Sequence, residues 1–348
     1  MKKLIIVSAL FAWIVCFSAA AQKKISVYAV GFYNQENLFD TCHDEGKRDY
    51  DFLPNGSYRW DGLKYSHKLK NMATALADMG TDVLPQVGCA LIGLSEVENA
   101  KVLTDLCSQA PLKARNMQFV HIEGPDRRGV DCALLYNPSL FTVRDVKLHP
   151  YVQTLAKDSA FYTRGFLTVQ GTLADEPVTV IVCHWPSRFS TSFYREQGAR
   201  QVRALKDSLL RANPNNKIMV MGDMNDDPTD KSMYEVLAAK EDIAKVGKDE
   251  MYNPWYNIIK KGTGTLYYNG AWNLFDQIVM TPNILNAAGQ RDFSTLKYWK
   301  CQIFRRDYLF QTEGKYKGAP KRTTAGGVWL DGYSDHLPVV IYLTKERK

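Results

Sequence analysis

Hydrophobic residues recur along the chain in short blocks that alternate or run together, a pattern typical of β-strands separated by turns. The first block, residues 25–33, alternates and is rich in β-branched and aromatic side chains. Further strands are predicted at residues 90–95, 130–136, 166–169, 178–183, 217–221, 274–280 and 339–343.

Two segments carry a helical pattern. Within residues 68–79, apolar positions recur at spacings of three and four, and Gly80 follows as a natural C-terminal cap. A second amphipathic helix is predicted around residues 202–210. Because no repeat or low-complexity linker divides the chain, we expect one α/β domain. Two long polar, aromatic-rich insertions are expected to interrupt it, at residues 41–66 and 297–333.

The first 21 residues have the pattern of a secretory signal peptide. Lys2 and Lys3 precede an apolar run over residues 4–17, and Ala19 and Ala21 form an Ala-x-Ala cleavage site. The run is short for a bilayer span, although a retained anchor is the alternative. We expect cleavage after Ala21 and an exported protein, periplasmic or secreted, without stable membrane insertion. Residues 22–348 would then form the single mature domain.

Composition narrows the class of protein. With 45% hydrophobic and 23% charged residues among 348, the chain is ordinary globular protein rather than disordered or coiled coil. The formal net charge of +7 permits a polyanionic partner without requiring one. The cysteines are scattered and no Cys-x-x-Cys occurs, so a zinc site is unsupported. Cys132 and Cys183 lie in predicted strands, where a buried thiol behaves as a small hydrophobe.

Five polar segments stand out because each lies at the end of a predicted strand, where α/β proteins tend to build functional sites. Taken singly, each is compatible with an ordinary turn or a solvated polar residue. The segment from Asp223 resembles the start of a calcium loop, but Pro228 and Tyr234 stand where an EF-hand needs Gly and Glu. The chemically active residues of the five segments are Asn34, Glu96, His184, Asp223 with Asn225, and Asp335 with His336.

Oxygen donors outnumber nitrogen and sulfur donors in this set. Such a set suits Mg²⁺, with Mn²⁺ or Ca²⁺ as alternatives, better than it suits zinc. Asp276 and the two histidines add acid–base capacity. The residues by themselves therefore indicate metal-assisted hydrolysis of a phosphoester.

The order of these motifs, over roughly residues 25–343, resembles the endonuclease/exonuclease/phosphatase superfamily. That group includes deoxyribonucleases, apurinic endonucleases, sphingomyelinases and inositol polyphosphate phosphatases. The resemblance implies a four-layer αββα sandwich, in which two mixed β-sheets pack face to face and the site lies at one end. It also implies Glu96 as the principal metal ligand, Asn34 nearby, and Asp335 approaching the metal from the far side.

The resemblance also assigns catalytic roles. Asp223 and Asn225 match the pair that orients or deprotonates the attacking water and holds the phosphate. His336 resembles the catalytic histidine, Asp276 the acid that fixes its tautomer, and His184 a second histidine facing the phosphate. Either Asp223 or His336 qualifies as the general base.

Two further assignments rest on sequence neighbours. Asp131 is the candidate partner of His184, because an acid that opens a neighbouring strand can reach it. Arg188, in the turn after His184, is the candidate phosphate clamp beside Asn34, since a guanidinium binds phosphate bidentately. A solvated surface arginine is the alternative.

The substrate is the least determined feature. Residues 297–333 interleave basic and aromatic side chains, which suits a nucleic-acid backbone and stacked bases, but also a phosphorylated headgroup or a solvated loop. We expect a nuclease or phosphodiesterase, with nucleic acid favoured over phosphorylated lipid or inositol. A lipid- or inositol-phosphate phosphatase and a sphingomyelinase-like phosphodiesterase are the alternatives, and an inactive binding module is a third. The expected state is a monomer.

Overall fold

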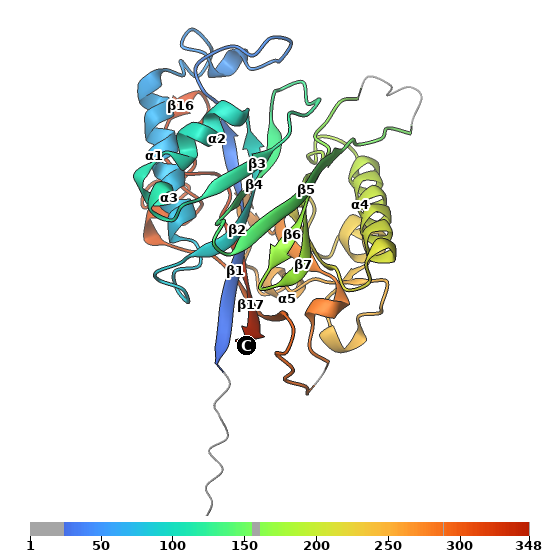
Figure 1. Ribbon diagram of the computed structural model, residues 1–348. Coiled ribbons are helices and arrows are strands. Elements are labelled where there is room, and N and C mark those ends of the chain that lie inside the picture. The colour runs from blue at the N-terminus through green and yellow to red at the C-terminus, as the bar shows by residue number, and fades with distance from the viewer. Residues whose placement is uncertain (1–23, 155–160, 288, 348) are drawn as a thin grey trace, which may run out of the picture.

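The computed structural model describes residues 24–154, 161–287 and 289–347 (Figure 1). The predicted signal peptide, residues 1–21, lies outside the described residues. In the part of the chain that is described, none of the helices combines the length and the apolar character needed to cross a bilayer.

The first sheet has six strands, with β1 near its middle. β1 runs parallel to β2 and antiparallel to β17. Both neighbours are almost wholly buried, as near-continuous apolar strands are expected to be. The order across the sheet is β14 (Lys297–Ile303), β17 (Val339–Glu346), β1 (Ile25–Leu38), β2 (Cys89–Val97), β4 (Asp131–Tyr136) and β3 (Gln118–His121).

The second sheet has seven strands and is also mixed. β7 and β8 run parallel, whereas β13 lies antiparallel to β8. The order is β5 (Phe141–His149), β6 (Phe166–Leu173), β7 (Glu176–His184), β8 (Lys217–Asp223), β13 (Asp276–Met280), β10 (Met251–Tyr252) and β9 (Ala239–Lys240).

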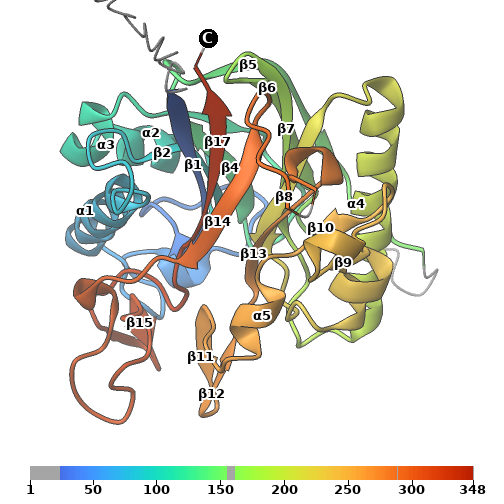
Figure 2. The same cartoon turned by 90° about the horizontal axis from the view of Figure 1, so that it is seen from below.

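Helices cover the outer face of each sheet, which makes four layers (Figure 2). α1 (Gly62–Asp78), α2 (Ala100–Cys107) and α3 (Ala110–Ala114) pack on the first sheet, and α4 (Ser192–Ala212) packs on the second. One apolar cluster fills the space between the sheets and under α1–α3, and a smaller one lies between the second sheet and α4. The expected αββα sandwich with two mixed sheets is confirmed.

Short elements connect these layers. Two small hairpins, β11 (Leu266–Tyr268) with β12 (Ala271–Asn273) and β15 (Thr324–Ala325) with β16 (Val328–Trp329), lie at one end of the sandwich (Figure 2). The remaining helical turns are η1 (Tyr50–Phe52), η3 (Ser232–Val236), η4 (Ile243–Lys245), α5 (Tyr256–Ile259), η5 (Pro282–Ile284) and η6 (Asp307–Leu309).

The predicted elements are present, but several bounds differ. α1 begins at Gly62, before the apolar pattern, because the Asp61 side chain accepts a hydrogen bond from the Lys64 amide and caps the helix. Gly80 follows α1 with φ +81°, as the predicted cap requires. Residues 297–303 were expected in an insertion but form β14, which pairs with β17. Cys132 and Cys183 are buried, as predicted, and both are free thiols, which the sequence did not decide.

Gly222 allows β7 and β8 to approach closely just before Asp223. A Cβ atom there would lie 2.1 Å from the Cys183 carbonyl oxygen of the neighbouring strand. Gly222→Ala should therefore lower the free energy of unfolding by about 1–3 kcal/mol, measured by chemical denaturation. Gly62→Ala is the matched control, because a Cβ at Gly62 meets nothing within 4 Å. Equal stability of the two variants would contradict this packing.

Candidate active site

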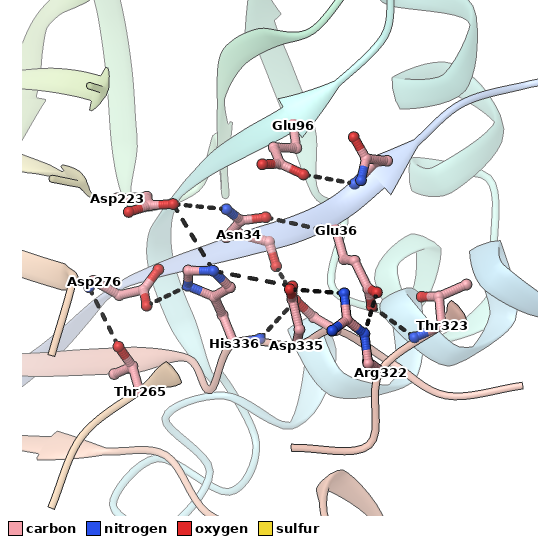
Figure 3. A network of polar contacts seen from close by, with 12 residues as sticks. Asn34, Glu36, Glu96, Asp223, Thr265, Asp276, Arg322, Thr323, Asp335 and His336 are labelled. Carbon is pink, nitrogen blue, oxygen red and sulfur yellow. Dashed lines mark hydrogen bonds and ion pairs between the residues drawn. The ribbon is translucent and has the colours of Figure 1, made fainter. Parts of the chain in front are cut away.

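Strand register brings the polar segments to one end of the sandwich. In the second sheet, Asp223 at the end of β8 pairs with His184 at the end of β7 and with Asp276 at the start of β13. In the first sheet, Asn34 on β1 pairs with Ser95, the residue before Glu96 on β2. Because the two sheets stack, the side chains of Asn34 and Glu96 face those of Asp223 and Asp276 (Figure 3).

His336 and Asp276 form a buried hydrogen-bonded pair. Nδ1 of His336 lies 2.7 Å from Oδ2 of Asp276, and Nε2 lies 3.9 Å from carboxylate oxygens of both Asp223 and Asp335 (Figure 3). Burial opposes the charged imidazole, but the carboxylates of Asp276 and Asp223 outweigh it and hold the pKa of His336 well above its usual value.

Asp223 is fixed from two sides. The Asn34 side-chain amide donates to Oδ2 at 3.0 Å, and the Asn225 backbone amide donates to Oδ1 at 2.9 Å. Asn225 has a left-handed backbone, φ 50°, and its side chain donates to the Trp185 carbonyl. Burial raises the pKa of Asp223 to about 7 even though His336 lies nearby. A carboxylate held this way can exchange a proton near neutral pH.

His184 lies between two carboxylates, in a buried position that disfavours its charged form. Its Nε2 is 3.7 Å from Oε1 of Glu96 and 3.6 Å from Oδ2 of Asp223. Burial, followed by the nearby guanidinium groups of Arg164 and Arg128, holds the pKa of His184 well below its usual value. Its other nitrogen, Nδ1, is buried without a hydrogen-bond partner among the described residues.

The predicted pairing of Asp131 with His184 is wrong. The Asp131 carboxylate lies 3.0 Å from Nε2 of His121 and accepts hydrogen bonds from the Gly124 amide. The strand pairing explains this, because β4 is bordered by β3, and β3 ends at His121. Asp131 therefore belongs to a neighbouring cluster and does not orient His184.

The predicted phosphate clamp at Arg188 is also not supported by the contacts. Its guanidinium binds the side chains of Asp227, Asp230 and Asn273, and stacks on Phe275. Arg188 is not among the described residues that line the cavity around Glu96, Asp223 and His336, and it holds the loop after Asn225 in place.

Other arginines line the cavity of the candidate site. A cavity of about 620 Å³ is lined by Glu96, His184, Asp223, Asn225, Asp335 and His336, together with Arg128, Arg164 and Arg322. Arg164 is nearly buried, where Asp126 and the Trp185 carbonyl hold it. Arg322 bridges Glu36 and Asp335 (Figure 3). Arg164 lies two residues before β6, so the rule applied to strand ends could have found it, whereas Arg322 had no such signal.

The predicted metal ligands offer donors that suit a hard cation. Oε2 of Glu96 accepts the Asn37 amide, which leaves Oε1 toward the cavity, and Oδ2 of Asp335 accepts from Arg322. Asn34 offers its side-chain oxygen, Oδ1, although that atom also accepts a hydrogen bond from the Glu36 backbone amide. One or two carboxylates, an amide oxygen and open cavity space fit Mg²⁺, which usually keeps several waters.

A separate trio lies outside this cavity. Possible metal-ligand atoms of His121, Glu123 and Asp131 lie within 4.8 Å of one another. Among the described residues, this is the group of three such side chains that lies so close together. Internal contacts already occupy the trio, however. Lys47 pairs with Glu123 at 2.8 Å, and Gly124 donates to Asp131.

The charge state of His336 can be tested directly. In the metal-free protein at about pH 7, both imidazole nitrogens should carry protons, because Asp276 and Asp223 stabilise the cation. Asp276→Asn should lower the pKa of His336, measured by ¹⁵N NMR titration of the ring. A neutral His336 ring in the wild-type protein at this pH would contradict the assignment.

Buried acids predict a pH dependence of stability. Burial raises the pKa of Glu98 to about 8 and that of Glu36 to about 7, as it does for Asp223. Each of these acids has a higher pKa in the folded protein than in the unfolded chain. Its contribution to the free energy of unfolding is fully present below its pKa in the unfolded chain and is lost as the pH rises through its pKa in the folded protein. In EDTA, the free energy of unfolding should therefore fall as the pH rises from about 5 to about 8.

Glu98→Gln is the matched variant for this slope, because it keeps an acceptor for the Asp40 amide and removes the charge. It should flatten the fall of stability with pH in denaturant titrations. A stability that is constant or rises over the same interval would contradict the buried-acid account.

Comparisons with known proteins identify the family of the chain. The family model described as "Endonuclease/Exonuclease/phosphatase family" matches residues 29–345. No curated protein sequence matches the chain. Among solved structures, ANGEL2, a 2′,3′-cyclic phosphatase, is similar at a TM-score of 0.57 and 12% identity, over 95% of this chain and 100% of that one.

Two other solved structures show the same fold at similarly low identity. The mannosyl-6-phosphatase Bt3783 of Bacteroides thetaiotaomicron has a TM-score of 0.54 and 13% identity, over 91% of this chain and 99% of that one. D. rerio TDP2 complexed with a single-strand DNA product has a TM-score of 0.52 and 13% identity, over 91% and 99%. The chain belongs to the endonuclease/exonuclease/phosphatase family and is a phosphoester hydrolase.

Proposed function

We propose that the protein is an exported, divalent-metal-dependent phosphodiesterase that acts on nucleic acid. The observation that carries the proposal is the position of Asp223. This buried carboxylate lies between His336 and His184, at 3.9 and 3.6 Å, and borders a cavity with arginines in its wall. One of these histidines has a raised pKa and the other a lowered pKa. Two such groups beside the same carboxylate and near cationic arginines suit the transfer of a phosphoryl group to water.

The roles of the side chains follow from their charge states. Asp223, with a pKa of about 7, accepts the proton of the attacking water, which Asn225 helps to orient. His336 is already protonated through Asp276, so it presents an N–H to the phosphoryl group rather than serving as the base. The pKa shifts thus favour Asp223 as the base, a choice that the sequence alone leaves open.

In this proposal, His184 and Arg164 hold the phosphate. His184 is uncharged and can donate one hydrogen bond from Nε2, and Arg164 lies close enough to lower its pKa. Arg164 is fixed by Asp126 and the Trp185 carbonyl, so it does not need to reorganise when negative charge develops. This arginine takes the clamp role first assigned to Arg188.

A divalent ion would be held by Glu96 and Asp335, with the Asn34 carbonyl nearby. When bound, it supplies Lewis-acid stabilisation of charge on the phosphoryl oxygens. Mg²⁺ is the proposed ion, with Mn²⁺ or Ca²⁺ as substitutes, because the available donors are oxygens. Export rests on the signal-peptide pattern in residues 1–21.

Nucleic acid is favoured because cations and exposed aromatic rings border the same cavity. Phe189 is fully exposed and Tyr162 and Tyr268 are more than half exposed, and all three line the cavity with the arginines. Exposed rings beside a cationic groove suit bases that stack while the backbone is held. The similar solved structures include a mannosyl-6-phosphatase, a 2′,3′-cyclic phosphatase and a protein bound to a single-strand DNA product, so the choice of substrate rests on this chain's own cavity.

The experiment uses residues 22–348 with Mg²⁺ or Mn²⁺ against supercoiled DNA, RNA, bis-p-nitrophenyl phosphate and p-nitrophenyl phosphate. Cleavage of the diesters should stop in EDTA and fall about 100-fold or more in His336→Ala and in Glu96→Gln. Glu98→Gln is the matched control, because Glu98 lies two residues from Glu96 but binds the Asp40 amide.

Turnover of the monoester alone would move the function to a phosphatase. Activity that survives EDTA, or that falls equally in Glu98→Gln, would refute the proposed metal-dependent site.

A further inference from the structure

A second cavity of about 510 Å³ adjoins the active site on the Asp335 side. Tyr267, Tyr268, Arg322 and Asp335 line both cavities, so the two share a wall. The combined space extends well beyond what one phosphoryl group occupies, since each cavity lies in the size range of ligand sites, about 300–1,000 Å³.

Three segments that are far apart in the sequence build the second cavity. Tyr58 comes from the segment before α1, Tyr267 and Tyr268 from β11, and Tyr316 from the segment after η6. The hairpin of β11 and β12 is connected to the catalytic centre, because Leu266 forms a β-bridge with His336. Tyr268 and Tyr316 remain 64% and 59% exposed, so their rings are available to a ligand.

The chemistry of the wall selects a ligand with a ring and a negative charge. Four tyrosines, Lys315 and Arg322 line the cavity, and among the described residues that line it Asp335 is the one acid. Asn269 and Gln311 add side-chain amides that can hydrogen-bond the edge of a base. Tyrosine faces stack on nucleobases without regard to sequence.

The wall is held firmly against the catalytic residues. Nε of Arg322 donates to Glu36 at 3.1 Å and Nη2 to Asp335 at 3.1 Å, and the Thr323 amide donates to Glu36 at 2.6 Å (Figure 3). The buried Lys68 donates to the Thr323 hydroxyl and to the Tyr333 carbonyl. The part of the wall that Arg322 and Thr323 form is therefore fixed on β1 and α1.

We propose that this second cavity is a nucleoside subsite. The base of the nucleotide on the Asp335 side of the scissile phosphate stacks on Tyr268 and Tyr316, while Arg322 marks the boundary between base and phosphate. The inference rests on the proposed function and adds to it that one flanking nucleotide is bound through its base. Recognition is by stacking, so the subsite tolerates different bases.

The experiment compares thymidylyl-thymidine with two analogues that lack one base each, on the 5′ or the 3′ side of the phosphate. Removal of the base that enters the subsite should lower kcat/KM about 5- to 100-fold, as expected for a stacked base. Removal of the other base should have a smaller effect. Tyr268→Ala and Tyr316→Ala should abolish the difference, whereas Tyr268→Phe should keep it.

Bis-p-nitrophenyl phosphate separates this inference from the function it rests on. If the wild-type protein hydrolyses that diester but treats the three dinucleotides alike, the subsite is refuted and the phosphodiesterase stands. If it hydrolyses none of the diesters, both fail. Tyr316→Ala should keep its activity on the small diester, because Tyr316 lines the second cavity and not the active-site cavity, and a parallel loss there would show a structural effect and overturn the stacking role.

Discussion

Two hydrogen bonds across the sandwich hold the active site together. Asn34 on β1 of the first sheet donates to Asp223 on β8 of the second, and His336 before β17 binds Asp276 on β13. Each bond joins one sheet to the other, so the site exists only where the sheets are stacked in this register. The close passage of β7 and β8 at Gly222 belongs to the same constraint, because it sets the position of Asp223.

Burial of charge explains the chemistry that the site offers. Three carboxyl groups of the site are at most 4% exposed: those of Asp223, Asp276 and Glu36. Burying a charged carboxylate costs free energy, which proteins offset by pairing the charge or by keeping the group protonated. His336, Lys68 and Arg322 provide the positive partners, but burial still raises the pKa values of Asp223 and Glu36. A divalent cation at Glu96 and Asp335 would complete this balance, which links metal binding to the protonation of the acids around it.

Sequence patterns predicted the strands and the clustered site because both depend on local features of the sequence. These features are the spacing of apolar residues and the polar residues at the end of each strand. Asn34, Glu96, Asp223, Asp276 and His336 meet as the motif order implied. Asp131 and Arg188 were misplaced because their partners depend on strand order and loop path: His121 comes from a strand that pairs beside Asp131, and Asp227 and Asp230 capture Arg188. Arg322 reaches Glu36 across 286 positions of the chain, which no local pattern encodes.

The central claim is that the cation acts at the end of the sandwich, beside Asp223. Anomalous diffraction from crystals containing Mn²⁺ tests it most directly, because the chain offers two competing places. We expect a peak next to Glu96 and Asp335 that disappears in Glu96→Gln. A peak at His121, Glu123 and Asp131, with none beside Glu96, would contradict it.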